Sequence, residues 1–361
     1  MNTTLNRLPV PTWNRLGVNF APAAAALPAV PDGGWGAAQV AESPLPAGVC
    51  AAAPDFADFS ASGVGADADA WVRQNANFVR HIAVNETVSA PLIYETTLDD
   101  AHPAAVEYLT VDAAAHTRLT VVQVLRGDAE NGAVAQLTRI RAGQGAVVTL
   151  VQVQLLGSRV RRWNAVAAET AQGGKVEQVR LELGGALTVC GTRAFLHSCR
   201  AAYELTAAYY GSGKQLLDFN DVSVHTAKDT VCEMHTAGVL TDEADKILRG
   251  TVDFQRGAVN GIGHESEDVL LFDPRVRNRT APLILCGEER VEGQHAASVG
   301  RLDEAKLYYL RSRGLSAAQA RRLMVDARFA PAIEKLPGEA LRQEVRHFVA
   351  ERLDAYEPLD R

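Results

Sequence analysis

The feature that most constrains this chain is a long succession of short segments in which apolar residues alternate with other residues. Such segments follow one another between residues 69 and 290, with residues 147–155 and 179–183 as examples. A period of two is typical of β-strands with two different faces, and the glycines between the segments indicate turns. The region therefore predicts a mainly β fold.

Three architectures offer so many short strands: a sandwich, a closed barrel and a solenoid. The segment is long for a single sandwich or barrel, and its breaks are not mainly the Asn-Gly pairs of tight hairpins. A parallel β-helix stacks each coil on the one before and leaves sheet edges only at its ends. We therefore expect a parallel β-helix core over residues 69–300, with irregular coils because no short-period repeat is present.

The N-terminal residues 1–68 have a different composition from the strand region. They are rich in Ala, Pro and Gly, and repeated prolines exclude a long helix. Large apolar residues such as Trp13 and Leu16 are isolated among small ones. We expect an irregular arm with at most short helical pieces, which packs its few aromatic residues onto another surface.

Residues 301–361 change to a helical period and predict a separate C-terminal helical domain. A short helix containing Leu307 and Leu310 is expected to end at Gly314, and Ser316 with Gln319 forms a capping box for the next helix. Pro331 is expected to break or kink that second helix. A stripe of apolar residues predicts a final helix. The stripe consists of Leu341, Val345, Phe348 and Val349.

Charge and cysteine content exclude several classes of protein. With 36 basic and 43 acidic residues the net charge is −7, which argues against a general nucleic-acid-binding surface. The N-terminus lacks the pattern of a signal peptide, and no apolar run is long enough to span a membrane. The five cysteines are scattered and form no CxxC pair. We expect a soluble cytoplasmic chain with reduced thiols that binds neither nucleic acid nor membrane.

Soft and borderline metal ligands occur late in the strand region. They are His225, Cys232, His235, Cys286 and His295. Cys232 and Cys286 lie in apolar strands, where a free cysteine is usually a core residue. Small residues flank His295, so its imidazole can be either accessible as a ligand or structural. Residues 264–268 do not form a zinc-binding HExxH motif and predict an acidic turn instead.

One pair of motifs carries a family resemblance. The stretch GQHAASVG at residues 293–300 is followed by LYYLRSRG at residues 307–314. This pair resembles the C-terminal signature of the SufB/SufD family, the iron–sulfur cluster assembly scaffolds, and its YLRSRG form is closest to SufD. Further blocks at residues 210–215, 224–226 and 238–240 fit the same family, and the resemblance is clearest over residues 200–335.

The resemblance implies an irregular right-handed parallel β-helix between helical or irregular ends. It implies a scaffold subunit that is not itself an enzyme and that holds a transient iron–sulfur cluster at an interface. His295 matches the family histidine implicated in cluster assembly, which makes it the expected cofactor-binding and metal-binding residue. Many relatives carry a cysteine two residues earlier, where this chain has Gly293. This departure favours a site shared with a partner that supplies the thiolates.

The resemblance also implies partners. A SufC-type ABC ATPase is expected on the C-terminal helical segment, and either SufB or a second copy of this chain at the end of the β-helix. The docking residues expected for SufC are Leu307, Tyr308, Leu310, Arg311 and Arg313.

Two other interpretations stay open besides a SufD-like subunit paired with SufB. One is a homodimeric scaffold of an ancestral SufBD type, and the other is an interaction module in which His295 has no role. A secreted-type β-helix enzyme acting on polysaccharides belongs to a different class. That class predicts a carboxylate cluster in a groove and a secretion signal, and neither is evident.

Overall fold

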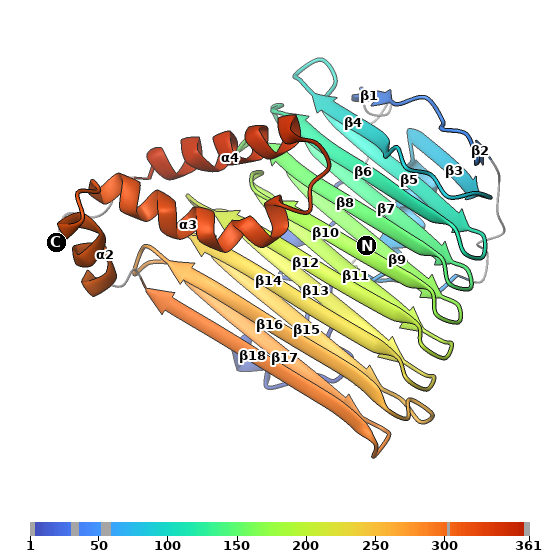
Figure 1. The fold of residues 1–361 in the computed structure, drawn as a ribbon. Coiled ribbons are helices and arrows are strands. Elements are labelled where there is room, and N and C mark those ends of the chain that lie inside the picture. The colour runs from blue at the N-terminus through green and yellow to red at the C-terminus, as the bar shows by residue number, and fades with distance from the viewer. Residues whose placement is uncertain (1–3, 30–35, 52–58, 302–303, 357–361) are drawn as a thin grey trace.

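Two long parallel sheets face each other and together form a β-solenoid, as the alternating segments predict (Figure 1). The computed structural model describes residues 4–29, 36–51, 59–301 and 304–356. The even-numbered sheet contains, in spatial order, β1 (Gln39–Glu42), β4 (Leu92–Leu98), β6 (Arg118–Gly127), β8 (Val147–Leu156), β10 (Lys175–Glu182), β12 (Ala202–Gly211), β14 (Val231–Leu240), β16 (Gly261–Leu271) and β18 (Val291–Arg301).

The odd-numbered sheet lies on the other side of the lumen. It contains β2 (Val49–Ala51), β3 (Phe78–Val84), β5 (Ala104–Ala113), β7 (Ala133–Ala142), β9 (Arg161–Thr170), β11 (Leu187–Leu196), β13 (Leu216–His225), β15 (Asp245–Phe254) and β17 (Arg277–Cys286). Among the strands of the described residues, only β1 and β2, at the first end of the solenoid, pair antiparallel to their neighbours. The domain limits at residues 68/69 and 300/301 stay predictions, and helix α1 (Ala66–Asn75) crosses the first of them.

Successive coils stack in register because the same turn recurs at one corner of each coil. The recurring turn residue adopts positive φ, and its amide donates a hydrogen bond to a carbonyl of the next coil, as His116 does to Gln144 at 2.7 Å. Glycine and asparagine or aspartate tolerate this conformation best, which accounts for many of the sequence breaks. The stacked turn residues are His116, Gly145, Gly173, Arg200, Asp229 and Asn260.

The lumen between the sheets is apolar along one half and polar along the other. Along β10, Val179 and Leu181 point outward, whereas Arg180 and Glu182 point into the lumen. This reverses the usual rule that charged residues face solvent. The buried charges are paired: Arg180 donates two hydrogen bonds to the Asp221 carboxylate at 2.8 and 2.7 Å. Paired in this way, the charges are retained inside the solenoid despite the cost of removing them from water.

Helices cover the outer face of the even-numbered sheet. Helix α3 (Ala317–Ile333) and helix α4 (Glu339–Asp354) lie across the middle strands (Figure 1) and bury Phe329 and Val345 against Val179 and neighbouring apolar residues. The predicted capping box of Ser316 is present. Pro331 lies in the last turn of α3, where the helix is about to end, so it does not break the helix.

The N-terminal arm packs against the outer face of the odd-numbered sheet. The buried Asn6 side chain donates to the Asp218 carboxylate at 2.6 Å and to the Cys190 carbonyl oxygen at 3.1 Å. The arm approaches so closely that a Cβ on Gly63 would overlap the backbone of Thr192. Its short 3-10 helices are Asn14–Leu16 and Ala23–Ala25. Trp13 is 81% exposed, so the packing expected for the aromatic residues of the arm is not met within this chain at Trp13, and Trp35 and Phe56 lie outside the described residues.

The buried pair of Arg180 and Asp221 generates a stability prediction. Replacing Asp221→Asn leaves the Arg180 charge buried without its counter-ion, so we expect the free energy of unfolding to fall by about 3–5 kcal/mol. Urea denaturation measures this change. The control is Glu243→Gln, which removes one partner of the exposed Arg275 pair and is expected to cost less than about 1 kcal/mol. Equal losses for both variants would contradict the importance of the lumen pair.

Candidate functional site at the open end of the solenoid

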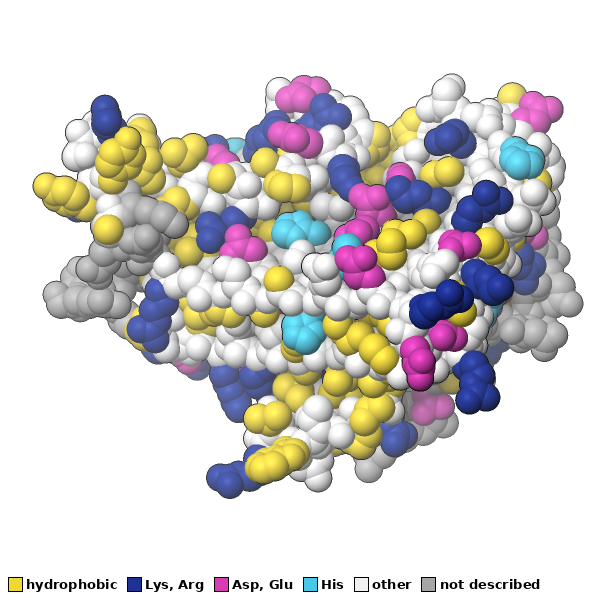
Figure 2. Space-filling view, turned by 60° about the horizontal axis from the view of Figure 1, so that its bottom comes forward, with side chains coloured by type: hydrophobic (Ala, Val, Ile, Leu, Met, Phe, Trp, Pro, Cys, Tyr) yellow, Lys and Arg dark blue, Asp and Glu magenta, His cyan; other side chains and the backbone are white. Residues whose placement is uncertain are grey.

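The last coil leaves two strands with a free edge. β17 and β18 each pair with one neighbour only, β15 and β16, and the side chains of β18 are largely exposed. Figure 2, in which this end of the molecule comes forward, shows histidine and acidic side chains gathered among apolar ones. An exposed strand edge offers a row of unpaired backbone groups to another chain.

His295 lies on the lumen side of β18. A Cβ added to Gly293 would lie 2.9 Å from Ile284 and 3.2 Å from Phe254, which are lumen residues, so Gly293 faces inward. Side chains alternate along a strand, so His295 faces the same way as Gly293. Because no coil follows β18 in the part of the chain that the structure describes, His295 is exposed at the mouth of the lumen. The structure therefore places the predicted ligand where it is accessible.

Glu265 is the neighbour of His295 in the preceding coil. The two residues are in register on the adjacent parallel strands β16 and β18, which places their side chains on the same face about 5 Å apart at the backbone. Glu265 is only 7% exposed. Burial raises its pKa to about 8, the negative charges of Asp221 and Glu267 add to this rise, and Lys246 opposes it. Glu265 is not among the site residues expected from the sequence, and the predicted acidic turn at residues 264–268 is wrong, because these residues form part of β16.

The outer side of the same strands carries a second group of polar residues. His264 contacts Glu233 through Nδ1 at 2.9 Å and Glu292 through Nε2 at 3.3 Å. His235 is half-buried, and its Nδ1 lies 2.9 Å from the Ser266 hydroxyl. Glu233, His235, His264 and Ser266 line a shallow hollow of about 270 Å³, and Glu265 and His295 also border it. Both ring nitrogens of His264 are engaged, so this group is already satisfied by its own hydrogen bonds.

The two candidate cysteine ligands, Cys232 and Cys286, lie away from His295. Cys232 is fully buried among apolar lumen residues, as expected, and burial raises its thiol pKa to about 12. The expectation that Cys286 lies in the core is wrong, because this residue is exposed at the end of β17. Across the lumen Gly293 of β18 faces Ile284 of β17. The two strands run in opposite directions, so Cys286, two residues after Ile284, and His295, two residues after Gly293, lie on opposite sides of this contact. Within the described ranges, no group of three or more His, Cys, Asp or Glu side chains is arranged to hold a metal ion.

The expected docking residues lie on α2 (Glu304–Ser312) and the turn after it. Tyr308 and Tyr309 are 75% and 56% exposed, whereas Leu307 and Leu310 are half-buried. Arg313 lies over the ring of Tyr309, with its guanidinium carbon 5.2 Å from the ring centroid. A hollow of about 750 Å³ begins beside Tyr308 and Arg311 and continues to the start of α3. This surface combines aromatic rings and arginines, residues that are enriched in protein interfaces.

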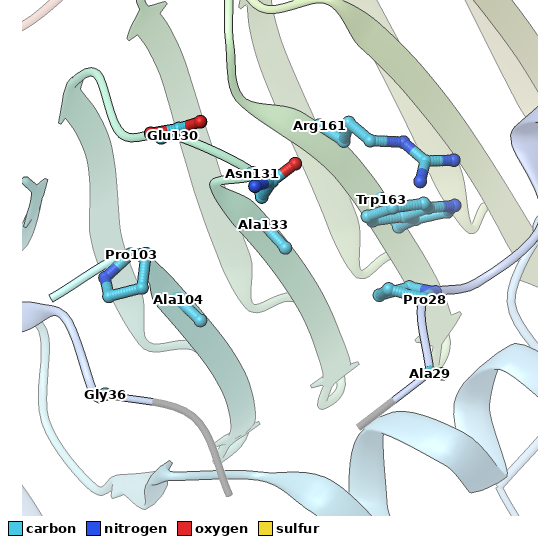
Figure 3. A pocket seen from close by; sticks show the side chains of 10 residues that line it. All are labelled: Pro28, Ala29, Gly36, Pro103, Ala104, Glu130, Asn131, Ala133, Arg161 and Trp163. Carbon is cyan, nitrogen blue, oxygen red and sulfur yellow. The ribbon is translucent and has the colours of Figure 1, made fainter. Parts of the chain in front are cut away.

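A more enclosed cavity of about 390 Å³ lies elsewhere (Figure 3), between the N-terminal arm and strands β5, β7 and β9. Trp163 lines it, and its indole NH donates to the Ala25 carbonyl oxygen at 2.8 Å. Arg161 lies over the same ring, 5.1 Å from its centroid. Because the lining is mainly small and apolar and Trp163 is used to hold the arm, this cavity shows no chemistry comparable to that at the open end.

The fold and the exposed histidine define a class: a parallel β-solenoid protein with helical and irregular ends and a polar site at its open end. The SufBD core domain of the SUF system for FeS cluster assembly matches residues 96–328. The chain belongs to the SufBD family. None of the helices in the described ranges is both long and apolar enough to cross a bilayer.

Curated relatives agree with this assignment. The iron–sulfur cluster assembly protein SufD of Bacillus subtilis is 25% identical over 269 residues, which cover 74% of this chain and 61% of that protein. SufD of Escherichia coli is 28% identical over 115 residues, covering 32% and 27% of the two chains. A SufBD family protein of Staphylococcus saprophyticus is 28% identical over 180 residues, covering 49% and 38%. The matched regions span less than two-thirds of the length of these relatives.

His225 generates a prediction for the dependence of stability on pH. Its ring is buried in the lumen between Ser223, Thr230 and Phe254, none of which is charged. Desolvation lowers its pKa to about 4, whereas in the unfolded chain it titrates near its ordinary value of 6.5. Between these pH values the unfolded chain binds a proton at His225 and the folded chain does not. The contribution of the neutral His225 ring to the free energy of unfolding is therefore complete above pH 6.5 and is lost as the pH falls towards 4.

The measurement compares urea denaturation of the wild type with that of His225→Gln at pH 7 and pH 5. We expect the stability advantage of the wild type to shrink by about 2 kcal/mol over this interval, because only the wild type carries the titrating ring. The comparison between the two proteins cancels the contribution of every other titrating group. Parallel losses in the two proteins would show that His225 does not titrate in this way.

Proposed function

We propose that this chain is a SufD-like scaffold subunit on which iron–sulfur clusters are assembled at a seam with a partner subunit. The observation that supports this proposal is the position of His295, which faces the lumen at an end of the solenoid that no coil covers. A neutral imidazole is a suitable ligand for iron, the cluster being cargo and not a permanent cofactor. In this proposal the chain binds and positions, and it is not itself an enzyme.

The open end also supports a shared site. His295 stands without a thiolate beside it, because the residue two positions earlier is Gly293 and Cys286 lies on the other side of that glycine. A partner that pairs with the free edges of β17 and β18 would cover the site and supply the missing ligands. SufB is the partner we propose, and a second copy of this chain is the alternative. All five cysteines are unpaired, which agrees with a reducing, cytoplasmic location.

The second proposed partner is a SufC-type ABC ATPase, docked on the surface formed by Tyr308, Tyr309, Arg311 and Arg313. Exposed aromatic rings beside arginines make strong contributions to interfaces when a partner buries them. Helix α2, which carries Tyr308, Tyr309 and Arg311, begins at Glu304, only three residues after β18 ends at Arg301. The ATPase would therefore bind close to the proposed cluster site.

The role of His295 is tested by replacing it in the assembled complex. For His295→Ala we expect cluster formation, measured as iron and acid-labile sulfide after anaerobic reconstitution with SufB and SufC from the same source, to fall at least about tenfold. The control is Gln294→Ala. Gln294 directly precedes His295 on the same exposed strand, and its side chain faces the outer side. A normal cluster yield with His295→Ala would remove this residue from the site.

The ATPase docking surface is tested by point substitutions, because α3 and α4 bury part of the core and their deletion would expose it. We expect the double substitution Tyr308→Ala and Arg311→Ala to weaken SufC binding at least about tenfold in calorimetry. Trp13→Ala removes an equally exposed aromatic ring on the other side of the solenoid and serves as the control. An unchanged affinity of the double variant would place the ATPase elsewhere.

A further inference from the structure

Glu265 is exceptional among the carboxylates inside the solenoid. Asp221 is paired with Arg180, and Glu182 is paired with Arg162 at 3.2 Å. By contrast, within the described part of the chain no hydrogen bond or ion pair is formed by Glu265, and its Oε2 is fully shielded from solvent. Burying a carboxylate without a partner has a substantial desolvation cost. The presence of Glu265 at this buried position therefore points to a ligand that binds its carboxylate.

The charges near Glu265 are already committed to other groups. Lys246 donates to Glu267 Oε1 at 2.5 Å and to the Thr280 hydroxyl at 3.0 Å. The Tyr209 hydroxyl donates to Glu267 at 2.9 Å. The carboxylate of Glu267, two residues along the same strand, therefore accepts several hydrogen bonds, whereas that of Glu265 accepts none in the described part of the chain. The difference shows that the lumen can pair a carboxylate at this depth and does not do so at Glu265.

The surrounding backbone leaves room at Glu265. The residue that faces it from β15 is Gly250, where a Cβ would overlap the carboxylate. In the last coil the residue in register with Gly250 is Pro282, which therefore stands opposite His295. Neither residue offers a side-chain donor or acceptor. The carboxylate and the imidazole thus share a small space that opens toward the end of the solenoid.

We propose that Glu265 and His295 together form a two-ligand half-site for a ferrous ion at the mouth of the lumen. A carboxylate and an imidazole are both suitable ligands for Fe²⁺, and neighbouring positions on parallel strands bring them to one ion. The remaining coordination positions face the open end, where water or a partner chain can occupy them. This inference rests on the proposed function and adds a second residue to it, with iron bound before any sulfide is present.

The test is an anaerobic titration of the isolated full-length chain with ferrous ammonium sulfate, read by competition with a chromogenic chelator. We expect Glu265→Gln and His295→Gln each to weaken Fe²⁺ binding at least about tenfold. The double variant is expected to lose less affinity than the two single losses combined, because both residues hold the same ion. Glu292→Gln, on the outer side of β18, is the matched control and is expected to bind like the wild type.

A second measurement separates this role from a structural one. Without metal, Glu265→Gln is expected to unfold at the same temperature as the wild type or higher, because the substitution removes an unpaired buried acid. The half-site is overturned if Glu265→Gln binds Fe²⁺ like the wild type, if the two single losses add in the double variant, or if the wild type binds no Fe²⁺. These outcomes leave the proposed function standing, because cluster assembly with SufB is measured separately on the His295 variant.

Discussion

The hydrogen bonding of each coil to the next is the interaction on which the rest of the structure depends. The backbone groups of every interior strand form hydrogen bonds with the strands of the coils on either side. Among the described strands, a free edge therefore exists only at the two ends of the solenoid. At the first end the antiparallel strands β1 and β2 change the direction of pairing. At the other end β17 and β18 keep parallel edges, with the side chains of β17 mostly half-buried and those of β18 largely exposed. The two ends of the solenoid therefore differ in the direction of strand pairing and in the exposure of their last strands.

The polar half of the lumen joins the two sheets of the solenoid through buried charged pairs. Charged groups that cross the lumen, such as Arg180 with Asp221 and Lys246 with Glu267, tie the two sheets together where apolar packing alone would allow them to slide. Each such pair is stable only when complete, because one buried charge without the other is costly. Glu265 departs from this rule one coil before the open end, and there the incomplete group lies beside the exposed imidazole of His295.

Much of the fold follows from the sequence because period and turn chemistry are local properties. The alternation in residues 147–155, the capping box of Ser316 and the final amphipathic helix are all confirmed. The site was harder to predict, because a period of two separates two faces without saying which one is buried. Glu265 meets His295 only through the register of strands 30 residues apart, which no local pattern contains. The exposure of Cys286 likewise depends on which coil is the last.

The placement of α2 gives the proposed ATPase a short route to the proposed site. Helices α3 and α4 are fixed to the even-numbered sheet by a shared apolar core and by the Arg126–Glu344 pair, with a nitrogen–oxygen distance of 2.6 Å. Helix α2, in contrast, exposes most of its described surface and lies between that fixed unit and the end of β18. A motor that displaced α2 would therefore act on the one strand of the even-numbered sheet that no following coil holds in place. Because His295 belongs to that strand, a small displacement would alter its distance from Glu265, whose own strand is held on both sides.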